Sequence, residues 1–288
     1  MKDLQPETIF FTALALRRAY GYSPPLARKE DRTSDMRRAI GKTDIGKRRK
    51  TNQDTFFIDE ALGLFIVADG MGGYAAGDVA SHEAVDNICD MIRTRKNCIA
   101  EFAQNPLEEK SRRKIKRLME SAVQSATYMV YGLAEQDPEN QGMGTTASVL
   151  LLAGANAIVA HVGDTRIYLI RDGVARQLTD DHTLISWQIR EGILTPEEAA
   201  KMPHKNVITR AVGNKEYVEV DTPIFEVLGT DRFLLCSDGL HGYISNNEIP
   251  EIVSLGLDQA AEKFIETAMS RGGKDNITAL VVGPEESA

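Results

Sequence analysis

Aspartate stands close to glycine or asparagine at five points along the chain, and each time it borders a run of apolar residues. The segments are Asn52-Gln53-Asp54, Asp69-Gly70, Gly163-Asp164, Ser237-Asp238-Gly239 and Lys274-Asp275-Asn276. A carboxylate at the end of an apolar strand is costly to bury unless another charge offsets it, and several carboxylates in one place repel one another. A divalent cation would remove both costs, because Mg²⁺ and Mn²⁺ prefer carboxylate, carbonyl and water oxygens as ligands.

A turn is the simpler explanation for each segment taken alone, since Asp-Gly and Asp-Asn are common turn residues. The metal site is therefore indicated only by the whole set. Several other kinds of site are excluded by pattern: the sequence has no His/Cys zinc spacing, no Gly-x-x-x-x-Gly-Lys-Ser/Thr loop and no Gly-x-Ser-x-Gly turn. The glycine-rich run from Asp69 to Gly73 precedes a helix, as a phosphate cradle would, but it lacks the lysine that such loops use.

The apolar pattern along the chain predicts the strands and helices that would position these aspartates. Short β-branched or aliphatic runs predict strands at 56–58, 62–68, 146–153, 157–162, 166–171, 174–178, 217–220, 222–227, 232–236 and 277–282. Apolar residues at steps of three and four predict a long helix at 115–133, and further helices are expected at about 76–93 and 257–270. Long helices mixed with an antiparallel meander, rather than a β-α-β alternation, indicate an α+β protein.

Two parts of the chain differ from this pattern. Residues 1–40 combine Pro24-Pro25 with a mixed-charge run, so we expect an N-terminal extension and linker ahead of a domain at 41–288. Within the extension, the apolar segment Ile9–Leu16 has no basic region before it, which favours a short docking helix over a signal peptide. Residues 181–206 are polar and interrupted by glycine and proline, which is typical of an insertion over a site.

The composition limits the kinds of partner and compartment. With 42 acidic and 34 basic residues the formal net charge is -8, which argues against a nucleic-acid binder, since such proteins usually carry a basic face. The cysteines, Cys89, Cys98 and Cys236, match no zinc pattern and are expected to be reduced thiols, which indicates a reducing, cytoplasmic compartment. No apolar stretch approaches the roughly 18 residues that a membrane span needs.

Seven short motifs follow one another from Arg49 onwards. They are Arg49-x-x-Asn52-Gln53-Asp54, Asp69-Gly70-Met71-Gly72-Gly73, Gly144-Thr145-Thr146, Val162-Gly163-Asp164-Thr165-Arg166, Leu178-Thr179-x-Asp181-His182, Ser237-Asp238-Gly239-Leu240 and Asp275-Asn276-Ile277-Thr278. In order and spacing they closely resemble the protein phosphatase 2C family in its bacterial form, over about residues 41–283. The resemblance implies a four-layer α-β-β-α sandwich, in which two antiparallel sheets are flanked by helices, with a mobile flap at 181–206 in a catalytic domain at 41–288.

The resemblance also implies a metal centre at one end of the sandwich. Asp69 would bridge two Mn²⁺ or Mg²⁺ ions. The other ligands would be the Gly70 carbonyl and Asp54 on one ion, and Asp238 and Asp275 on the second. Asp164 would help Asp238 to hold a third, weaker ion.

Arg49, Asp69 and Asp238 would carry the reaction in this family. Two ions would share a water, lower its pKa and present hydroxide in line with the phosphorus atom. Arg49 would grip the substrate phosphate, a role that suits the fork of its guanidinium, and Asn276 would orient neighbouring groups. No covalent phosphoenzyme is required.

Two residues depart from the family pattern. Gln53 stands where many members have glutamate, which removes a carboxylate from the surroundings of one ion. Met71 stands where animal members have a histidine proposed as the general acid, and methionine cannot donate a proton. The proton would then come from a metal-bound water or from another group. His161, His182, His204 and His241 are candidates, although we expect structural or surface roles for them.

The function implied is that of a metal-dependent serine/threonine protein phosphatase in signal transduction. Its partners would be phosphorylated proteins, among them a serine/threonine kinase or its substrates, with no nucleic acid and no membrane span. Two alternatives are a catalytically silent phosphoprotein-binding regulator and a phosphatase dedicated to one regulatory protein in a partner-switching pathway. The silent regulator would be expected to lack metal aspartates, whereas the sequence does not separate a dedicated phosphatase from a general one.

Overall fold

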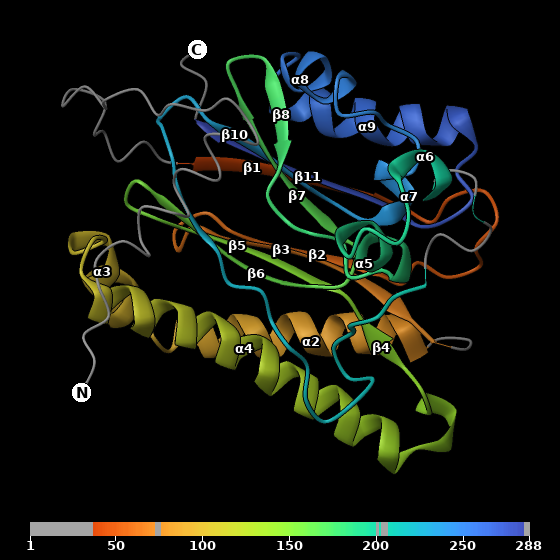
Figure 1. Ribbon diagram of the computed structural model, residues 1–288, viewed down its shortest axis with the longest axis horizontal. Helices are drawn as coiled ribbons and strands as arrows, with labels where there is room; N and C mark the ends of the chain where they lie inside the picture. Colours follow the sequence, from red (N-terminus) through yellow and green to blue (C-terminus); the bar gives the residue numbers. More distant parts are fainter. Residues whose placement is uncertain (1–36, 73–75, 200–201, 203–206, 285–288) are drawn as a thin grey trace. The chain divides into compact units, whose positions relative to one another are not determined.

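A computed structural model describes residues 37–72, 76–199, 202 and 207–284, and Figure 1 shows two stacked β-sheets between two layers of helices. The first sheet is antiparallel, with the strand order β1-β11-β10-β7-β8. Its strands are β1 (Arg37–Asp44), β7 (Arg166–Arg171), β8 (Val174–Gln177), β10 (Arg232–Cys236) and β11 (Ile277–Pro284).

The second sheet is also antiparallel, with the order β2-β3-β5-β6-β9, and the short strand β4 pairs with the end of β3. Its strands are β2 (Asp54–Asp59), β3 (Leu64–Met71), β4 (Gly144–Thr145), β5 (Ala147–Ala153), β6 (Asn156–Val162) and β9 (Ile224–Glu226).

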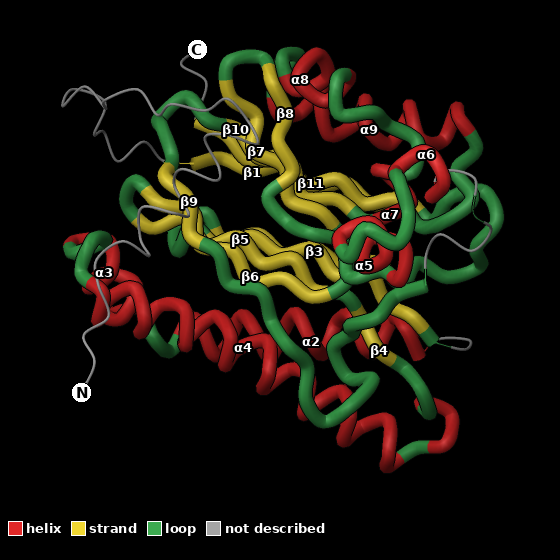
Figure 2. Tube along the Cα trace, viewed as in Figure 1, coloured by secondary structure: helices red, strands yellow, loops and turns green. Residues whose placement is uncertain are grey.

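Helices cover the outer face of each sheet (Figure 2). α2 (Ala76–Arg93) and α4 (Glu109–Gln136) pack on the second sheet, and α9 (Leu257–Arg271) packs on the first. Along α4 the apolar residues recur every three or four positions, so they form one buried stripe. The other described helical elements are α3 (Lys96–Gln104), the 3₁₀ turn η1 (Pro138–Asn140), α5 (Leu184–Arg190), α6 (Pro196–Ala199), α7 (Asp238–His241) and α8 (Glu248–Val253).

Strand β3 shows how the layers share the core. Leu64 and Ile66 are buried against α2 and α4, whereas Phe65 and Val67 are buried between the two sheets. Successive side chains of a strand point to opposite faces, so a strand buried on both faces reads as an unbroken apolar run. The α+β sandwich predicted from the sequence is confirmed by this arrangement.

One predicted strand is wrong. Residues 217–220 alternate in polarity as a strand would, but their backbone is irregular. The backbone N–H of Val218 donates to Oε1 of Gln124 on α4 at 3.2 Å, so a side chain takes the place of a neighbouring strand. The alternation arises because Val218 packs into the core beside α4, while Tyr217 is exposed.

The domain boundary expected at residue 40 falls inside β1, which pairs with β11 from Arg37 to Asp44. Ala39 is the buried position of this edge strand, so the segment lacks the apolar pattern that identifies the other strands. Residues 1–36, and with them the expected helix at Ile9–Leu16, lie outside the described residues.

The expected flap is described at 181–199 and 202. Its two ends lie side by side, because Leu184 N donates to the Val207 carbonyl at 2.8 Å. Helix α6 begins with a capping box: Glu198 N donates to Oγ1 of Thr195 at 3.2 Å, and Thr195 N donates to Oε2 of Glu198 at 2.8 Å. Among the described helices, none combines the length and apolarity that crossing a membrane requires.

Candidate metal centre

Asp54, the first residue of β2, is buried with only part of its carboxylate satisfied. Its Oδ2 accepts hydrogen bonds from Ser237 Oγ and Thr278 Oγ1, both at 2.7 Å. Its Oδ1 is also buried, and no described group donates to it. Burial raises the pKa of Asp54 to about 6, although the two hydroxyl donors oppose the shift. An unpartnered buried carboxylate oxygen is costly, and it is a ligand that a hard cation would accept.

Asp69 lies directly opposite Asp54 in the β2–β3 ladder. Its backbone is fixed by its neighbours, since Asp69 N donates to Thr146 Oγ1 and the Asp69 carbonyl accepts from Thr145 Oγ1, each at 2.9 Å. Burial raises the pKa of Asp69 well above its ordinary value. Further raising comes from four neighbouring carboxylates, namely Asp54, Asp238, Asp164 and Asp275. The predicted acidic residues therefore act on one another at one end of the sandwich.

Gly70 has no room for a side chain. A Cβ atom on Gly70 would lie 1.9 Å from the carbonyl oxygen of Gly77 in the first turn of α2. The backbone N–H of Gly70 donates to the Gln53 carbonyl at 3.0 Å. Gln53 is itself buried, and a Cβ atom on Gly77 would lie 2.6 Å from the side-chain Nε2 of Gln53. The sequence thus needs glycine twice to bring α2 against the end of β3.

Asp164 and Asp238 lie on the side of the first sheet. Asp164, in the turn between β6 and β7, is buried, and burial followed by the charge of Asp238 raises its pKa to about 7. Its carbonyl accepts from Nε2 of His241 at 2.9 Å. Asp238 is the first residue of α7, and that helix packs so closely on the chain before β11 that a Cβ on Gly239 would lie 1.9 Å from the Asn276 carbonyl oxygen.

Asn276 ties the loop that carries Arg49 to the start of β11. Its Oδ1 accepts from Gln53 N at 2.9 Å, and its Nδ2 donates to the carbonyls of Ile45 at 2.9 Å and Thr51 at 3.0 Å. One amide side chain thereby fixes both ends of the loop between β1 and β2, because it supplies an acceptor and two donors.

Arg49 points from this loop to Asp275. Its Nη2 donates to Asp275 Oδ2 at 2.5 Å, and this hydrogen bond is the main cause that raises the pKa of the guanidinium. About half of the Arg49 side chain is exposed (51%), so a ligand from solvent can reach it. The charges of Asp69 and Asp238 act on Arg49 in the same direction.

The carboxylates are neighbours, but their side chains do not converge on one point. Within the described part of the chain, no group of three or more Asp, Glu, His or Cys side chains is arranged to hold a metal ion. Asp275 is turned to Arg49, and one oxygen of Asp54 is turned to two hydroxyls. Side-chain rotation would be needed to bring these oxygens around a cation.

Several residues that hold the centre had no role in the sequence analysis. Thr145, Thr146 and Thr278 stand in the quoted motifs, so the spacing contained them, but nothing in a sequence says that a hydroxyl there meets Asp69 or Asp54. Ser237 is a similar case. Ser237 and Thr278 share a motif with an aspartate, whereas the motif of Thr145 and Thr146 has none, so only its place in the series of motifs could have marked these two residues.

Of the histidines considered as proton donors, His161 and His182 are buried and His241 is half-buried. His161 is fully buried, and burial lowers its pKa to about 4. The pKa of His241 is lowered to about 4 by the same cause. His182 is buried as well: its Nδ1 accepts from Gly163 N at 3.1 Å and its Nε2 contacts Oδ2 of Asp221 at 3.1 Å. His204 lies outside the described residues.

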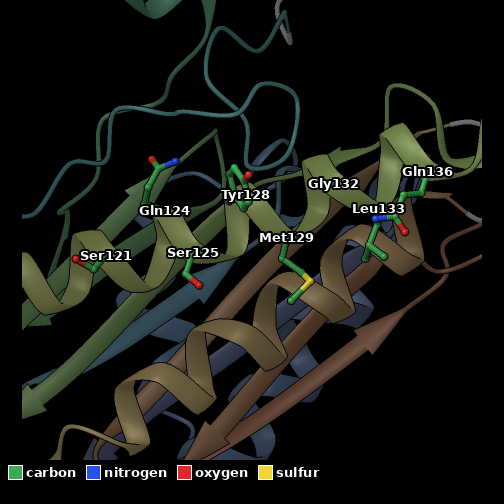
Figure 3. Close-up of a pocket in the computed structure, with 8 residues that line it drawn as sticks. All are labelled: Ser121, Gln124, Ser125, Tyr128, Met129, Gly132, Leu133 and Gln136. Carbon is green, nitrogen blue, oxygen red and sulfur yellow. The ribbon is translucent and has the colours of Figure 1, made fainter.

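A hollow of about 670 Å³ lies elsewhere, on the outer face of α4 (Figure 3). Its lining residues are Ser121, Gln124, Ser125, Tyr128, Met129, Gly132, Leu133 and Gln136. None of them is acidic or basic, and none is a predicted site residue. The hollow is therefore separate from the acidic centre.

Comparison with known proteins establishes the family. A family model described as protein phosphatase 2C matches residues 43–281, so the chain belongs to the protein phosphatase 2C family. The serine/threonine phosphatase stp of Listeria monocytogenes is 38% identical over 246 residues, which are 84% of this chain and 93% of that protein. Protein phosphatase PhpP of Streptococcus pneumoniae is 37% identical over 253 residues, which are 85% of this chain and 96% of that protein.

Solved structures give the same result. The Mycobacterium tuberculosis serine/threonine phosphatase PstP/Ppp matches with a TM-score of 0.76 at 33% identity, covering 87% of this chain and 99% of that chain. The catalytic domain of PstP in complex with 2 manganese ions matches with a TM-score of 0.72 at 32% identity, covering 86% of this chain and 97% of that chain. The family, the sandwich fold and the phosphatase class predicted from the motifs are confirmed.

Proposed function

We propose that this protein hydrolyses phosphoserine and phosphothreonine in other proteins with the help of two divalent cations, Mn²⁺ or Mg²⁺. The observation that carries the proposal is the unpartnered, buried Oδ1 of Asp54 amid carboxylates that raise the pKa of Asp69. A cluster of like charges with an unused buried acceptor fits hard cations, which favour oxygen ligands. When bound, such ions lower the pKa of water and offset the charge of a phosphoryl group.

The ligand roles that we propose are those that the resemblance to the family implies, and the mutual influence of these carboxyl groups supports them. Asp69 is influenced by the charges of all four other carboxylates and would serve both ions. The remaining ligands would be the Gly70 carbonyl and Asp54 for one ion, and Asp238 and Asp275 for the other. The charge of Asp238 raises the pKa of Asp164, and the two residues would share a third, weaker ion.

Arg49 would exchange its partner when substrate binds. In the ion pair with Asp275 it offers a guanidinium that is half exposed, and a phosphoryl group presents a matching pair of oxygens. Transfer of Arg49 from the carboxylate to the substrate would also release Asp275 for an ion. Asn276 and Gln53 would keep the loop in place during this exchange, because Asn276 accepts from Gln53 N and bonds both ends of the loop.

The serine or threonine oxygen needs a proton as it leaves the phosphorus atom. Met71, at the end of β3, cannot supply one. His161 is buried and His241 is half-buried, and burial lowers the pKa of each to about 4, which makes them poor donors at neutral pH. We therefore assign this proton to water in the site rather than to a side chain.

Phosphorylated proteins, among them a serine/threonine kinase or its substrates, are the partners that we propose. A silent phosphoprotein-binding regulator is disfavoured, since the chain keeps every aspartate of the cluster. A phosphatase dedicated to one regulatory protein would have the same site, and a panel of phosphoproteins would reveal it as activity on a single member.

The test is phosphate release from a phosphothreonine peptide with Mn²⁺ and with EDTA. We expect activity only with the metal, and a loss of roughly a hundredfold or more in Asp238→Asn, the size of effect seen when a charge-stabilising group is removed from an active site. Isothermal titration with Mn²⁺ should show weaker binding to the same variant. Undiminished phosphate release in EDTA would refute the proposal.

A further inference from the structure

Four exposed cations stand around Arg49, on two loops that are far apart in sequence. Lys47, Arg48 and Lys50 flank Arg49 in the loop between β1 and β2, and Lys274 precedes Asp275. We call Lys47, Arg48, Lys50 and Lys274 the basic rim. All four are exposed, and none of them forms an ion pair with another described residue. Exposed cations without a partner are free to bind an anion from solution.

The two loops of the basic rim are packed on each other. Lys47 N donates to the Gly273 carbonyl at 2.6 Å. A Cβ on Gly46 would lie 2.1 Å from the Asp275 carbonyl oxygen, so only glycine fits between the loops. The bonds from Asn276 to Ile45 and Thr51 hold the ends of the first loop. The backbone of the rim is therefore fixed beside the acidic centre.

The charge of the rim is opposite to that of the chain as a whole. Residues 44–50 and 274–275 contain five cations and two carboxylates, in a protein whose formal net charge is -8. Both carboxylates are already engaged: Asp44 Oδ1 accepts from Gly46 N at 2.8 Å, and Asp275 pairs with Arg49 at 2.5 Å. The local excess of positive charge thus faces solvent beside Arg49.

We propose that the basic rim binds acidic residues on either side of the phosphorylated residue, so that the preferred substrates are acidic phosphopeptide segments. This inference rests on the proposed phosphatase function of the same site. Residues of an extended peptide are about 3.3 Å apart, and lysine and arginine side chains are long enough to meet carboxylates one to three positions away from a phosphate held by Arg49. Each such exposed pair contributes little, but several together give a measurable preference.

Three phosphothreonine peptides of equal length test the proposal, with aspartate and glutamate, with serine and asparagine, or with arginine around the phosphorylated residue. With Mn²⁺ at low salt, the wild-type protein should cleave the acidic peptide with a kcat/KM roughly tenfold above that of the neutral peptide, and the basic peptide should be poorest. The advantage should reside in KM, and it should shrink between about 50 and 500 mM salt because screening weakens exposed charge pairs.

Direct binding gives a second readout that needs no turnover. In EDTA, the fluorescence anisotropy of a labelled acidic phosphopeptide should show binding that is roughly tenfold weaker for Lys47→Ala/Arg48→Ala/Lys50→Ala than for the wild type. The matched control is Arg95→Ala/Lys96→Ala/Lys110→Ala, which removes the same charge from exposed positions at α3 and the start of α4. The control should keep the wild-type preference for the acidic peptide.

The outcomes separate this inference from the function on which it rests. If the wild type cleaves all three peptides equally, or if the rim variant keeps the acidic preference, the basic rim does not select substrates. If labelled vesicles of anionic phospholipid bind the rim and acidic peptides do not, the rim has another ligand and the inference is overturned. If the wild type releases no phosphate from any peptide with Mn²⁺, the proposed function itself fails.

Discussion

Asp54 and Asp69 lie directly opposite each other in the β2–β3 ladder, and the hydroxyls of Ser237 and Thr278 both donate to Asp54 from the other sheet. Like charges opposite each other destabilise an antiparallel pair. The two hydroxyls offset part of this cost on one oxygen of Asp54, and the second oxygen has no described donor. In the absence of metal, the centre therefore opposes the stability of the sandwich that surrounds it.

The first prediction concerns the pH dependence of stability in EDTA. The pKa of Asp54 is raised to about 6 and that of Asp164 to about 7, from ordinary values near 4. Each protonated form is favoured in the folded state, so the stabilisation is fully present below pH about 4 and is lost as the pH rises through 6 to 7. Between pH 8 and about 5.5 these two carboxyl groups should therefore raise the unfolding free energy by on the order of 2 kcal/mol. His161 and His241 act in the opposite direction over the same range, because burial lowers their pKa values to about 4 and the unfolded chain takes up their protons first. The contribution of the carboxyl groups is therefore measured as a difference from variants that lack them.

Saturating Mn²⁺ should remove most of this pH dependence and raise the melting temperature at pH 8. Asp54→Asn and Asp164→Asn each keep the shape of the side chain without its charge, so in EDTA the wild type should gain stability relative to either variant as the pH is lowered from 8 to 5.5. A difference in stability between the wild type and these variants that stays constant from pH 8 to pH 5.5 in EDTA would contradict the assignment of the raised pKa values.

The second prediction concerns Arg49. Arg49→Ala should raise KM for a phosphothreonine peptide roughly tenfold or more, because a charged hydrogen-bond partner of the phosphate is lost. Mn²⁺ affinity should change little. A rise is expected if the loss of Arg49 frees Asp275 to serve an ion. Arg49→Lys keeps the charge without the fork and should recover only part of the loss. Steady-state kinetics and calorimetry measure the two effects separately, and an unchanged KM in Arg49→Ala would argue against its role at the phosphate.

The third prediction concerns the start of the folded domain. Removal of residues 1–33 should leave the melting temperature nearly unchanged, because β1 begins at Arg37. Removal of residues 1–44 should destabilise the protein severely, since β1 pairs along its whole length with β11 and Arg37 donates to the carbonyls of Asp231 and Leu228. Thermal unfolding of the two truncated proteins decides the matter, and equal stability would show that β1 contributes nothing.

Sequence reasoning found the elements whose burial is strong. The apolar run from Leu64 to Ala68 predicted β3, and the stripe from Ile115 to Leu133 predicted α4, because both are buried along their length. It missed β1, whose one buried position, Ala39, gives no periodic signal. It overread 217–220, where Val218 is buried but bonded to the side chain of Gln124. Local polarity thus reports burial, whereas strand pairing depends on partners far away in the chain.

The same division holds for the centre. Asp54, Asp69 and Asp164 were predicted by their position at the ends of apolar runs, and the structure places them within electrostatic reach of one another. The ion pair between Arg49 and Asp275 joins residues 226 positions apart, and the sequence around either residue does not indicate the other as its partner. Which carboxylate meets which donor is set by the stacking of the two sheets, and that information is not local.

The fourth prediction concerns the close contact that brings α7 to β11. Gly239→Ala would place a Cβ atom 1.9 Å from the Asn276 carbonyl oxygen, so α7 must move, and with it Asp238. We expect a loss of stability of roughly 2 kcal/mol, the size typical of overpacking, together with weaker Mn²⁺ binding. The matched control is Gly132→Ala near the C-terminal end of α4, where nothing lies within 4 Å of the added atom. That change should stabilise the protein by up to about 1 kcal/mol through helix propensity, and it should leave Mn²⁺ affinity as in the wild type. Thermal unfolding and calorimetry with Mn²⁺ measure both variants, and a Gly239→Ala protein that binds Mn²⁺ as tightly as the wild type would show that the position of α7 does not govern the centre.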